Sequence, residues 1–174
     1  ARGEAYAMRI LVATASRHGA TARIGDVVAQ ELLANGHEVE RRELGDSGRL
    51  SPEALSTQGF DAVVLGGAVY TGTWLATALD AQTRLLAAGV PTVSFAVGIL
   101  EVTAEPVQDR WTLPRTSASA GERVVFGGTI DKQVLSFRER SLLAVVRAKE
   151  GEYTQWDDVQ AWATAVAQSL VVTA

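Results

Sequence analysis

Short apolar runs along the chain predict strands that are buried on both faces of a sheet. They cover residues 8–14, 60–66, 91–98 and 123–128 and are rich in branched apolar side chains. Runs of this kind are typical of parallel strands. Residues 37–43 alternate only weakly between apolar and polar, so they predict an edge strand. Together these segments predict a five-stranded sheet.

Apolar residues at helical spacing predict the helices between the strands. The first helix is expected to end at Asn35-Gly36 and the second at Gly89, because glycine favours the left-handed conformation that stops a helix. Thr154, with Asp157 three residues later, predicts the start of the last helix. The apolar series are Ile24, Val27, Val28 and Leu32; Leu75, Ala78, Leu79, Leu85 and Leu86; and Val159, Trp162, Ala163, Val166 and Leu170.

The alternation of strands and helices predicts an α/β fold, a doubly wound parallel sheet with helices on both faces. We expect one domain over residues 8–174, with residues 1–7 as a disordered extension or tag remnant. In such sheets, ligands bind beyond the carboxyl ends of the strands, where the strand order reverses. The residues that directly follow each strand are therefore the functional candidates.

The composition excludes several kinds of site. The 174 residues include no cysteine, which excludes disulfides, thiol catalysis and cysteine-held metal clusters. His18 and His37 are the only histidines, too few for a multi-histidine metal site. The net charge of −4 is not that of a basic nucleic-acid binder. With no run near the length of a membrane span and no leader pattern, we expect a cytoplasmic protein.

The loop after the first strand predicts a phosphate site. Residues 14–21 read TASRHGAT, with three hydroxyl side chains and a glycine just before the helix. The free N–H groups and dipole of a helix N-terminus attract anions, and Arg17 and His18 add positive charge nearby. The loop matches neither the dinucleotide-binding glycine motif nor the Walker motif. An ordinary helix N-cap is the alternative interpretation.

The loops after the next two buried strands predict contacts to a flat ring. Residues 67–74 contain two glycines, which let the backbone approach a ligand closely, and Tyr70 and Trp74, which could cover a ring face. The alternative is that Trp74 begins a helix and packs in the core. Residues 97–101 are apolar with one glycine, as a wall beside a ring would be.

Together the loops resemble those of flavodoxins. Ser16-x-x-Gly19-x-Thr21 is similar to the FMN phosphate loop, and residues 67–74 and 97–101 are similar to the ring-flanking loops. Within this superfamily, three segments most resemble the branch that contains the menaquinone-linked protoporphyrinogen dehydrogenases. Their sequences are ATASRHGATARIG, GGAVYTGTW and GEYTQWDDVQAWA. The resemblance implies the flavodoxin-like strand order 2-1-3-4-5.

The same resemblance implies an FMN-dependent oxidoreductase that takes electrons from a porphyrinogen and passes them to a quinone. Arg17, Tyr70 and Arg110 are candidates for contacting the substrate, and no side chain is required as an acid or base. The implied cofactor-binding residues are Thr14, Ser16, Arg17, His18, Gly19, Ala20, Thr21, Ala68, Val69, Tyr70, Thr71, Gly72, Trp74, Val97, Gly98 and Ile99.

Departures from the family pattern leave other functions open. The chain is less acidic than flavodoxins that act as soluble carriers, His18 stands where threonine is common, and residues 101–121 are less helical in pattern. The alternatives are a soluble electron carrier, an NAD(P)H-dependent quinone or flavin reductase, and a flavodoxin-fold protein that has lost FMN binding.

Residues 132–149 predict a basic amphipathic helix. They carry five basic residues, one acidic residue and seven large apolar residues. Such a helix is typical of contact with an anionic membrane surface, and the family that the chain resembles has an insertion here and uses a membrane quinone. The alternative is that the apolar side packs on the domain. The segment is a candidate for peripheral contact with the inner face of the membrane.

Overall fold

Parallel strands form the central sheet of the computed structural model, which describes residues 5–17, 19–51, 53–70, 73–98, 124–127, 129–130, 151–152, 154–169 and 172–173. The strands are β2 (Arg9–Ala15), β3 (Glu38–Glu43), β4 (Ala62–Tyr70), β6 (Thr92–Gly98) and β7 (Val124–Gly127). They lie in the order β3-β2-β4-β6-β7, and every neighbouring pair is parallel. Counted along the chain, this is the order 2-1-3-4-5, so the predicted fold class is confirmed.

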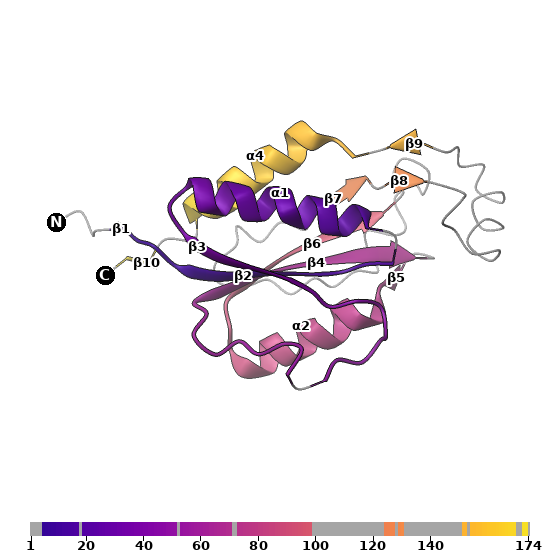
Figure 1. Ribbon diagram of the computed structural model, residues 1–174, viewed down its shortest axis with the longest axis horizontal. Helices are drawn as coiled ribbons and strands as arrows, with labels where there is room; N and C mark the ends of the chain where they lie inside the picture. Colours follow the sequence, from indigo (N-terminus) through magenta and orange to yellow (C-terminus); the bar gives the residue numbers. More distant parts are fainter. Residues whose placement is uncertain are drawn as a thin grey trace.

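The apolar runs form strands because helices cover both faces of the sheet. Helices α1 (Ala20–Ala34) and α4 (Trp156–Ser169) lie side by side on one face, and α2 (Ala76–Ala88) lies on the other (Figure 1). Every side chain of β6 is buried, and so is every side chain of β2 after the first. Strand β3 at the edge is only partly buried, as its weak alternation predicts.

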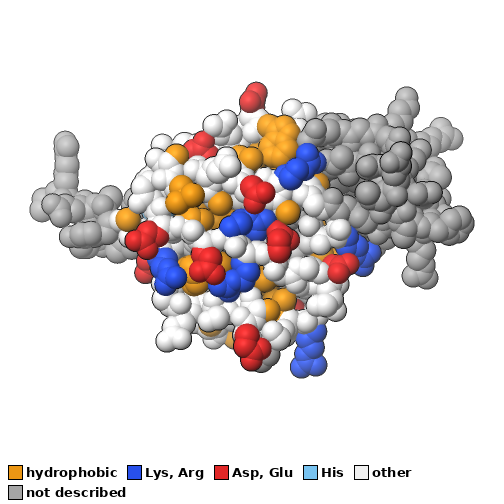
Figure 2. Space-filling view, viewed as in Figure 1, with side chains coloured by type: hydrophobic (Ala, Val, Ile, Leu, Met, Phe, Trp, Pro, Cys, Tyr) orange, Lys and Arg blue, Asp and Glu red, His pale blue; other side chains and the backbone are white. Residues whose placement is uncertain are grey.

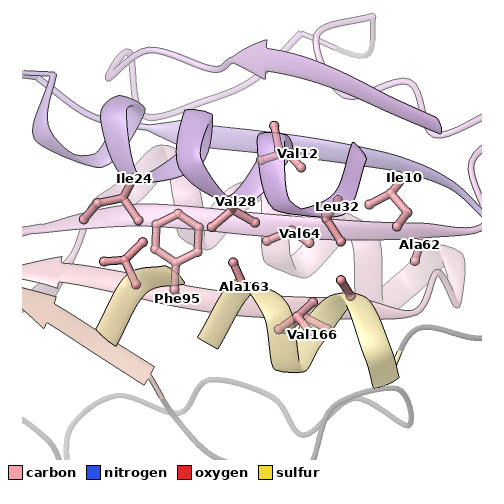
Figure 3. Packing of buried hydrophobic residues seen from close by; sticks show 14 of the residues in the cluster. Ile10, Val12, Ile24, Val28, Leu32, Ala62, Val64, Phe95, Ala163 and Val166 are labelled. Atoms are coloured by element: carbon pink, nitrogen blue, oxygen red, sulfur yellow. The ribbon is translucent and has the colours of Figure 1, made fainter. Parts of the chain in front are cut away.

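An apolar cluster fills the space between the sheet and each helical layer. Neighbouring residues of a strand point to opposite faces, so Ile10 and Val12 enter the cluster under α1 and α4, while Leu11 and Ala13 enter the cluster under α2. Figure 3 shows the first cluster, in which side chains of the sheet meet Ile24, Val28, Leu32, Ala163 and Val166 of the two helices. Full burial of one such branched side chain contributes about 1.5–3 kcal/mol.

Glycine residues end the first two helices where the sequence predicts. Helix α1 is followed by Asn35 and by Gly36 at φ +89°, and α2 is capped by Gly89 at φ +69°. Both glycines have the left-handed backbone that other residues rarely adopt.

The Gly66-Gly67 pair lies inside β4, so the prediction of a strand over residues 60–66 followed by a loop from residue 67 is wrong at this boundary. Strand β4 continues to Tyr70 and pairs with β2 and β6 on either side of the glycines. A Cβ atom on Gly66 would lie 2.1 Å from Cζ of Phe95, and one on Gly67 would lie 2.1 Å from Nε1 of Trp74. The two rings belong to the clusters on opposite faces of the sheet. The glycines are therefore needed for aromatic packing, not for a turn.

The edge strand β3 is covered by charges of both signs. Glu40 is bonded to Arg42 and lies 3.8 Å from Arg9, and the two guanidinium groups are 5.9 and 4.7 Å from the centre of the Phe60 ring. Figure 2 shows acidic and basic side chains interspersed over the described part of this face. Charges along an edge strand discourage pairing with a second chain.

His37 connects the start of β2 with the end of α4. Its ring is buried, Nδ1 accepts a hydrogen bond from the backbone N–H of Met8 at 3.2 Å, and Nε2 lies 3.0 Å from the carbonyl oxygen of Ala167. Because Nδ1 is an acceptor here, the proton of the neutral ring is on Nε2, which donates to Ala167. His37 is therefore a structural residue in this fold.

Short antiparallel pairs lie outside the central sheet. Strand β1 (Ala5–Tyr6) pairs with β10 (Val172–Thr173), so residues 5–6 form a strand within the segment that the sequence predicts as an extension. Strand β8 (Thr129–Ile130) pairs with β9 (Gly151–Glu152). The predicted basic helix and residues 101–121 lie outside the described residues. None of the described helices is long and apolar enough to cross a bilayer.

Candidate functional site

The carboxyl ends of the parallel strands lie together at one edge of the sheet. Strands β2, β4 and β6 end there at Ala15, Tyr70 and Gly98, and helices α1 and α2 begin at the same edge (Figure 1). All neighbouring strand pairs are parallel, so the three loops identified from the sequence share this edge. The structure therefore brings the predicted loop segments to one candidate site.

The first loop presents the N-terminus of α1. Gly19 is the N-cap residue in the left-handed conformation, at φ +85°, and its carbonyl oxygen accepts the N–H of Arg23 at 3.1 Å. Within the described residues, no side chain caps this helix. An uncapped helix N-terminus leaves backbone N–H groups that can bind an anion. Ser16, in the loop, is partly buried, and Thr21, in the first turn of α1, is buried. With the free N–H groups, these hydroxyl side chains fit a phosphate group.

Of the two basic residues in this loop, the structure describes only Arg17. Arg17 forms an ion pair with Asp46, from the segment after β3, at 3.3 Å, and both side chains are exposed. The charge of Arg17 is thus partly balanced within the chain. His18 lies outside the described residues.

Thr14, which the sequence predicts as a phosphate contact, takes part in a polar cluster beneath the loop. Its Oγ1 accepts a hydrogen bond from Nη2 of Arg41 at 2.8 Å and donates to Glu43. A hydroxyl group has one proton to donate, and Thr14 directs that proton at Glu43. Contact of Thr14 with the cofactor stays a prediction. Arg41 and Glu43 were missed in the sequence because they lie 27 and 29 residues from Thr14. The one local signal is Gly25, a glycine inside a helix.

The second loop turns back on its strand. Strand β5 (Thr73–Trp74) pairs antiparallel with the end of β4, with Val69 opposite Trp74 and Tyr70 opposite Thr73. Ala68 is buried and its carbonyl oxygen accepts the N–H of Leu75 at 2.8 Å. The described part of the chain does not include Thr71, Gly72 or the side chain of Tyr70.

Trp74 lies in the core under α2. Its side chain is only 4% exposed, and it packs against Gly67 beside Ala78. Among the described residues, its Nε1 has no hydrogen-bond partner. This position agrees with the alternative interpretation, in which Trp74 packs in the core. Ring stacking by Tyr70 stays a prediction.

The third loop follows β6 beside the end of β4. Val97 is buried, and a Cβ atom on Gly98 would lie 3.3 Å from Cβ of Val69, so the ends of the two strands are in close contact. Ile99 lies outside the described residues. The described residues at the ends of β4 and β6, Val69, Val97 and Gly98, carry no polar side chain, and their contact with a flat ring stays a prediction.

Several solved structures share this fold. Oxidised flavodoxin 2 from Bacillus cereus has 21% identity and a TM-score of 0.55, covering 93% of this chain and 99% of that chain. The flavodoxin, WrbA-like protein from Agrobacterium tumefaciens has 13% identity and a TM-score of 0.53, covering 94% of this chain and 95% of that chain. At these identities the likeness shows the fold alone.

The comparison with protein families shows the family of the chain, whereas the structural likeness shows only its fold. No curated protein matches the sequence. The flavodoxin domain family matches residues 11–157, which include the first loop, all five parallel strands after the first residues of β2, and the start of α4. The match covers well over half of the chain and agrees with the strand order of the sheet. The chain therefore belongs to the flavodoxin domain family, and this membership implies FMN as its cofactor.

Proposed function

We propose that the chain is an FMN-dependent oxidoreductase of the protoporphyrinogen dehydrogenase type, which passes electrons from a porphyrinogen to a quinone. The observation that carries the proposal is the uncapped N-terminus of α1, placed at the carboxyl end of β2 in a flavodoxin fold. The amino-acid sequences of the segments around the loops favour this branch of the family, because they resemble it more than the other functional classes that share the fold.

The described residues would bind and shield the cofactor. Backbone N–H groups in the first turn of α1, with the hydroxyl groups of Ser16 and Thr21, would hold the phosphate. Thr21 is only 1% exposed, and a hydrogen bond to an anion is stronger where water is excluded. The ends of β4 and β6, at Val69 and Gly98, would line the ring. When bound, FMN supplies the electron-transfer chemistry, while the chain supplies binding and orientation.

We expect the purified chain to bind FMN in preference to FAD and ATP, because the loop closes around a terminal phosphate and offers no path for a pyrophosphate. Thr21→Ala should weaken FMN binding by about 1.5–3 kcal/mol, the range for a hydrogen bond to a charged group. Titration calorimetry with FMN, FAD and ATP measures both effects.

Thr83→Ala is the matched control for this experiment. Thr83 lies on α2, and its hydroxyl donates to the carbonyl oxygen of Leu79 in the same helix at 3.0 Å. FMN affinity should be unchanged in this variant. FAD binding as tight as FMN binding would contradict the assignment of the loop.

We further propose that residues 132–149 bring the protein to an anionic membrane surface, where the quinone accepts the electrons. Strand β8 pairs with β9, and the two strands flank this segment in the sequence. A single residue, Gly128, separates β8 from the end of β7 at Gly127. The described residues before and after the segment, Ile130 and Gly151, are therefore paired, and they lie near the end of β7 at the carboxyl edge of the sheet. A basic residue near an anionic leaflet contributes on the order of 1 kcal/mol, so a segment with five basic and one acidic residue can supply about 4 kcal/mol.

We expect FMN-loaded protein with protoporphyrinogen as the donor to reduce a quinone held in anionic vesicles at low salt. The rate should fall as salt screens the charges. The double change Arg138→Glu and Arg140→Glu should weaken vesicle binding about tenfold or more. Vesicle co-sedimentation and absorbance of the quinone report the two steps.

The control is Arg49→Glu, a charge reversal at an exposed position after β3. It should leave vesicle binding unchanged. Absence of vesicle binding at low salt would overturn the membrane proposal. Flavin reduction by NADPH, without turnover of the porphyrinogen, would favour an NAD(P)H-dependent reductase instead.

A further inference from the structure

Arg41 extends from the edge strand β3 to the underside of the first loop. Its guanidinium group is the centre of a polar cluster, and the side chain is 21% exposed. Nη2 lies 2.8 Å from Oγ1 of Thr14, 3.0 Å from the carbonyl oxygen of Ala22 and 2.6 Å from Oε1 of Glu43. Nε donates to Oδ1 of Asp26 at 3.0 Å. The group thus bonds to β2, β3 and α1 at once.

Two of these partners stand on either side of the phosphate loop. Thr14 belongs to β2, before residues 16–19 that join this strand to α1, whereas Ala22 lies after them in the first turn of α1. A single nitrogen atom, Nη2, bonds to both of them. The position of Arg41 therefore sets the separation between the two ends of the loop.

Gly25 makes room for this arrangement. A Cβ atom at position 25 would lie 2.9 Å from Nη2 of Arg41 and 2.7 Å from Cγ2 of Thr14. Glycine inside a helix is less favourable than alanine, so its presence at position 25 calls for a packing reason. Gly25 is a buried residue of α1, and at this position a residue without a side chain lets the guanidinium group reach the loop.

We propose that Arg41 is a positioning residue, which holds the first loop in the conformation that binds the phosphate of FMN. The inference rests on the proposed phosphate site. The charge of Arg41 is balanced by Asp26 and Glu43, so its effect on a phosphate comes through the shape of the loop. Holding a binding loop in its bound conformation before the ligand arrives raises affinity, because less freedom is lost on binding.

The planar fork of arginine is required for this role. One guanidinium group directs Nε at Asp26 and Nη2 at the loop, while Nη1 donates to the carbonyl oxygen of Arg42 at 2.8 Å. A lysine ammonium group keeps the charge but cannot direct donors to partners spread along two elements. Arg41→Lys therefore separates the geometric role from the charge.

Titrations with FMN and riboflavin test the proposal, because riboflavin has the same ring without the phosphate. The variants are Arg41→Met, Arg41→Lys and Gly25→Ala, with urea unfolding to confirm that each is folded. We expect each to weaken FMN binding about tenfold or more and to leave riboflavin binding unchanged.

Arg42→Met is the matched control, since Arg42 is the next residue of the same strand and is also partly buried, bonded to Glu40 and to the carbonyl oxygen of Ser56. It should not change the ratio of FMN to riboflavin affinity. Equal weakening of both flavins by Arg41→Met, or wild-type FMN affinity in Arg41→Lys, would overturn the positioning role while leaving the proposed function intact. A wild-type chain that binds neither flavin would overturn both.

Discussion

Gly66→Ala is expected to lower the free energy of unfolding by about 3 kcal/mol, at the upper end of the usual cost of overpacking a core. The added Cβ would lie 2.1, 2.5 and 2.6 Å from three atoms of the Phe95 ring. That ring is fully buried and meets Phe126 and Trp162 at centroid distances of 6.0 and 5.7 Å. The backbone of Gly66 is also paired with strands on both sides, so neither partner can move away easily. Urea unfolding measures the effect.

A double-mutant cycle with Phe95→Leu shows whether the ring is the cause. Leucine leaves space over Gly66, so the double variant should be more stable than the sum of the two single changes predicts. Gly98→Ala is the control, because the nearest atom to its Cβ would be Cβ of Val69, at 3.3 Å, and we expect a smaller loss. Additive effects of Gly66→Ala and Phe95→Leu would show that the methyl group and the ring do not meet.

Trp74→Ala is expected to lower the free energy of unfolding by about 3–5 kcal/mol, the range for removing a large buried ring. Trp74 is 4% exposed and covers Gly67 under α2. Because the ring packs in the core, the folded fraction of the variant should bind FMN with nearly wild-type affinity. Unfolding followed by circular dichroism, together with FMN titration, measures the two quantities separately.

Trp74→Phe keeps most of the packing and removes the buried Nε1, for which the described part of the chain offers no hydrogen-bond partner, so its cost should be smaller. Tyr70→Ala is the contrasting variant, since Tyr70 is the last residue of β4 at the candidate site. Loss of FMN affinity with full stability in Tyr70→Ala would support the predicted contact with the ring. The same result in Trp74→Ala would place that side chain on the flavin instead of in the core.

The pattern of apolar residues was sufficient to predict the sheet and its helices. Runs such as residues 8–14 become strands because a strand buried on both faces needs apolar side chains at every position. The stops at Gly36 and Gly89 were predictable because a left-handed residue is a local requirement. The loop that joins β2 to the N-terminus of α1 was also predictable, because a helix N-terminus and its preceding strand are adjacent in the chain.

The function of individual residues at the site depended on contacts that the sequence does not show. Gly66-Gly67 has the composition of a turn, but two rings from opposite faces require glycine inside a strand. Trp74 has the composition of a ring contact, but it is buried under α2. Thr14 is bonded to Arg41, which is distant in sequence and becomes its neighbour only when β3 joins the edge of the sheet beside β2. Local conformation follows from neighbouring residues in the chain, whereas these contacts arise from the order of strands and the packing of helices upon them. The sequence by itself therefore determined the elements and the position of the loop between β2 and α1, and the tertiary structure decided which side chains are available to a ligand.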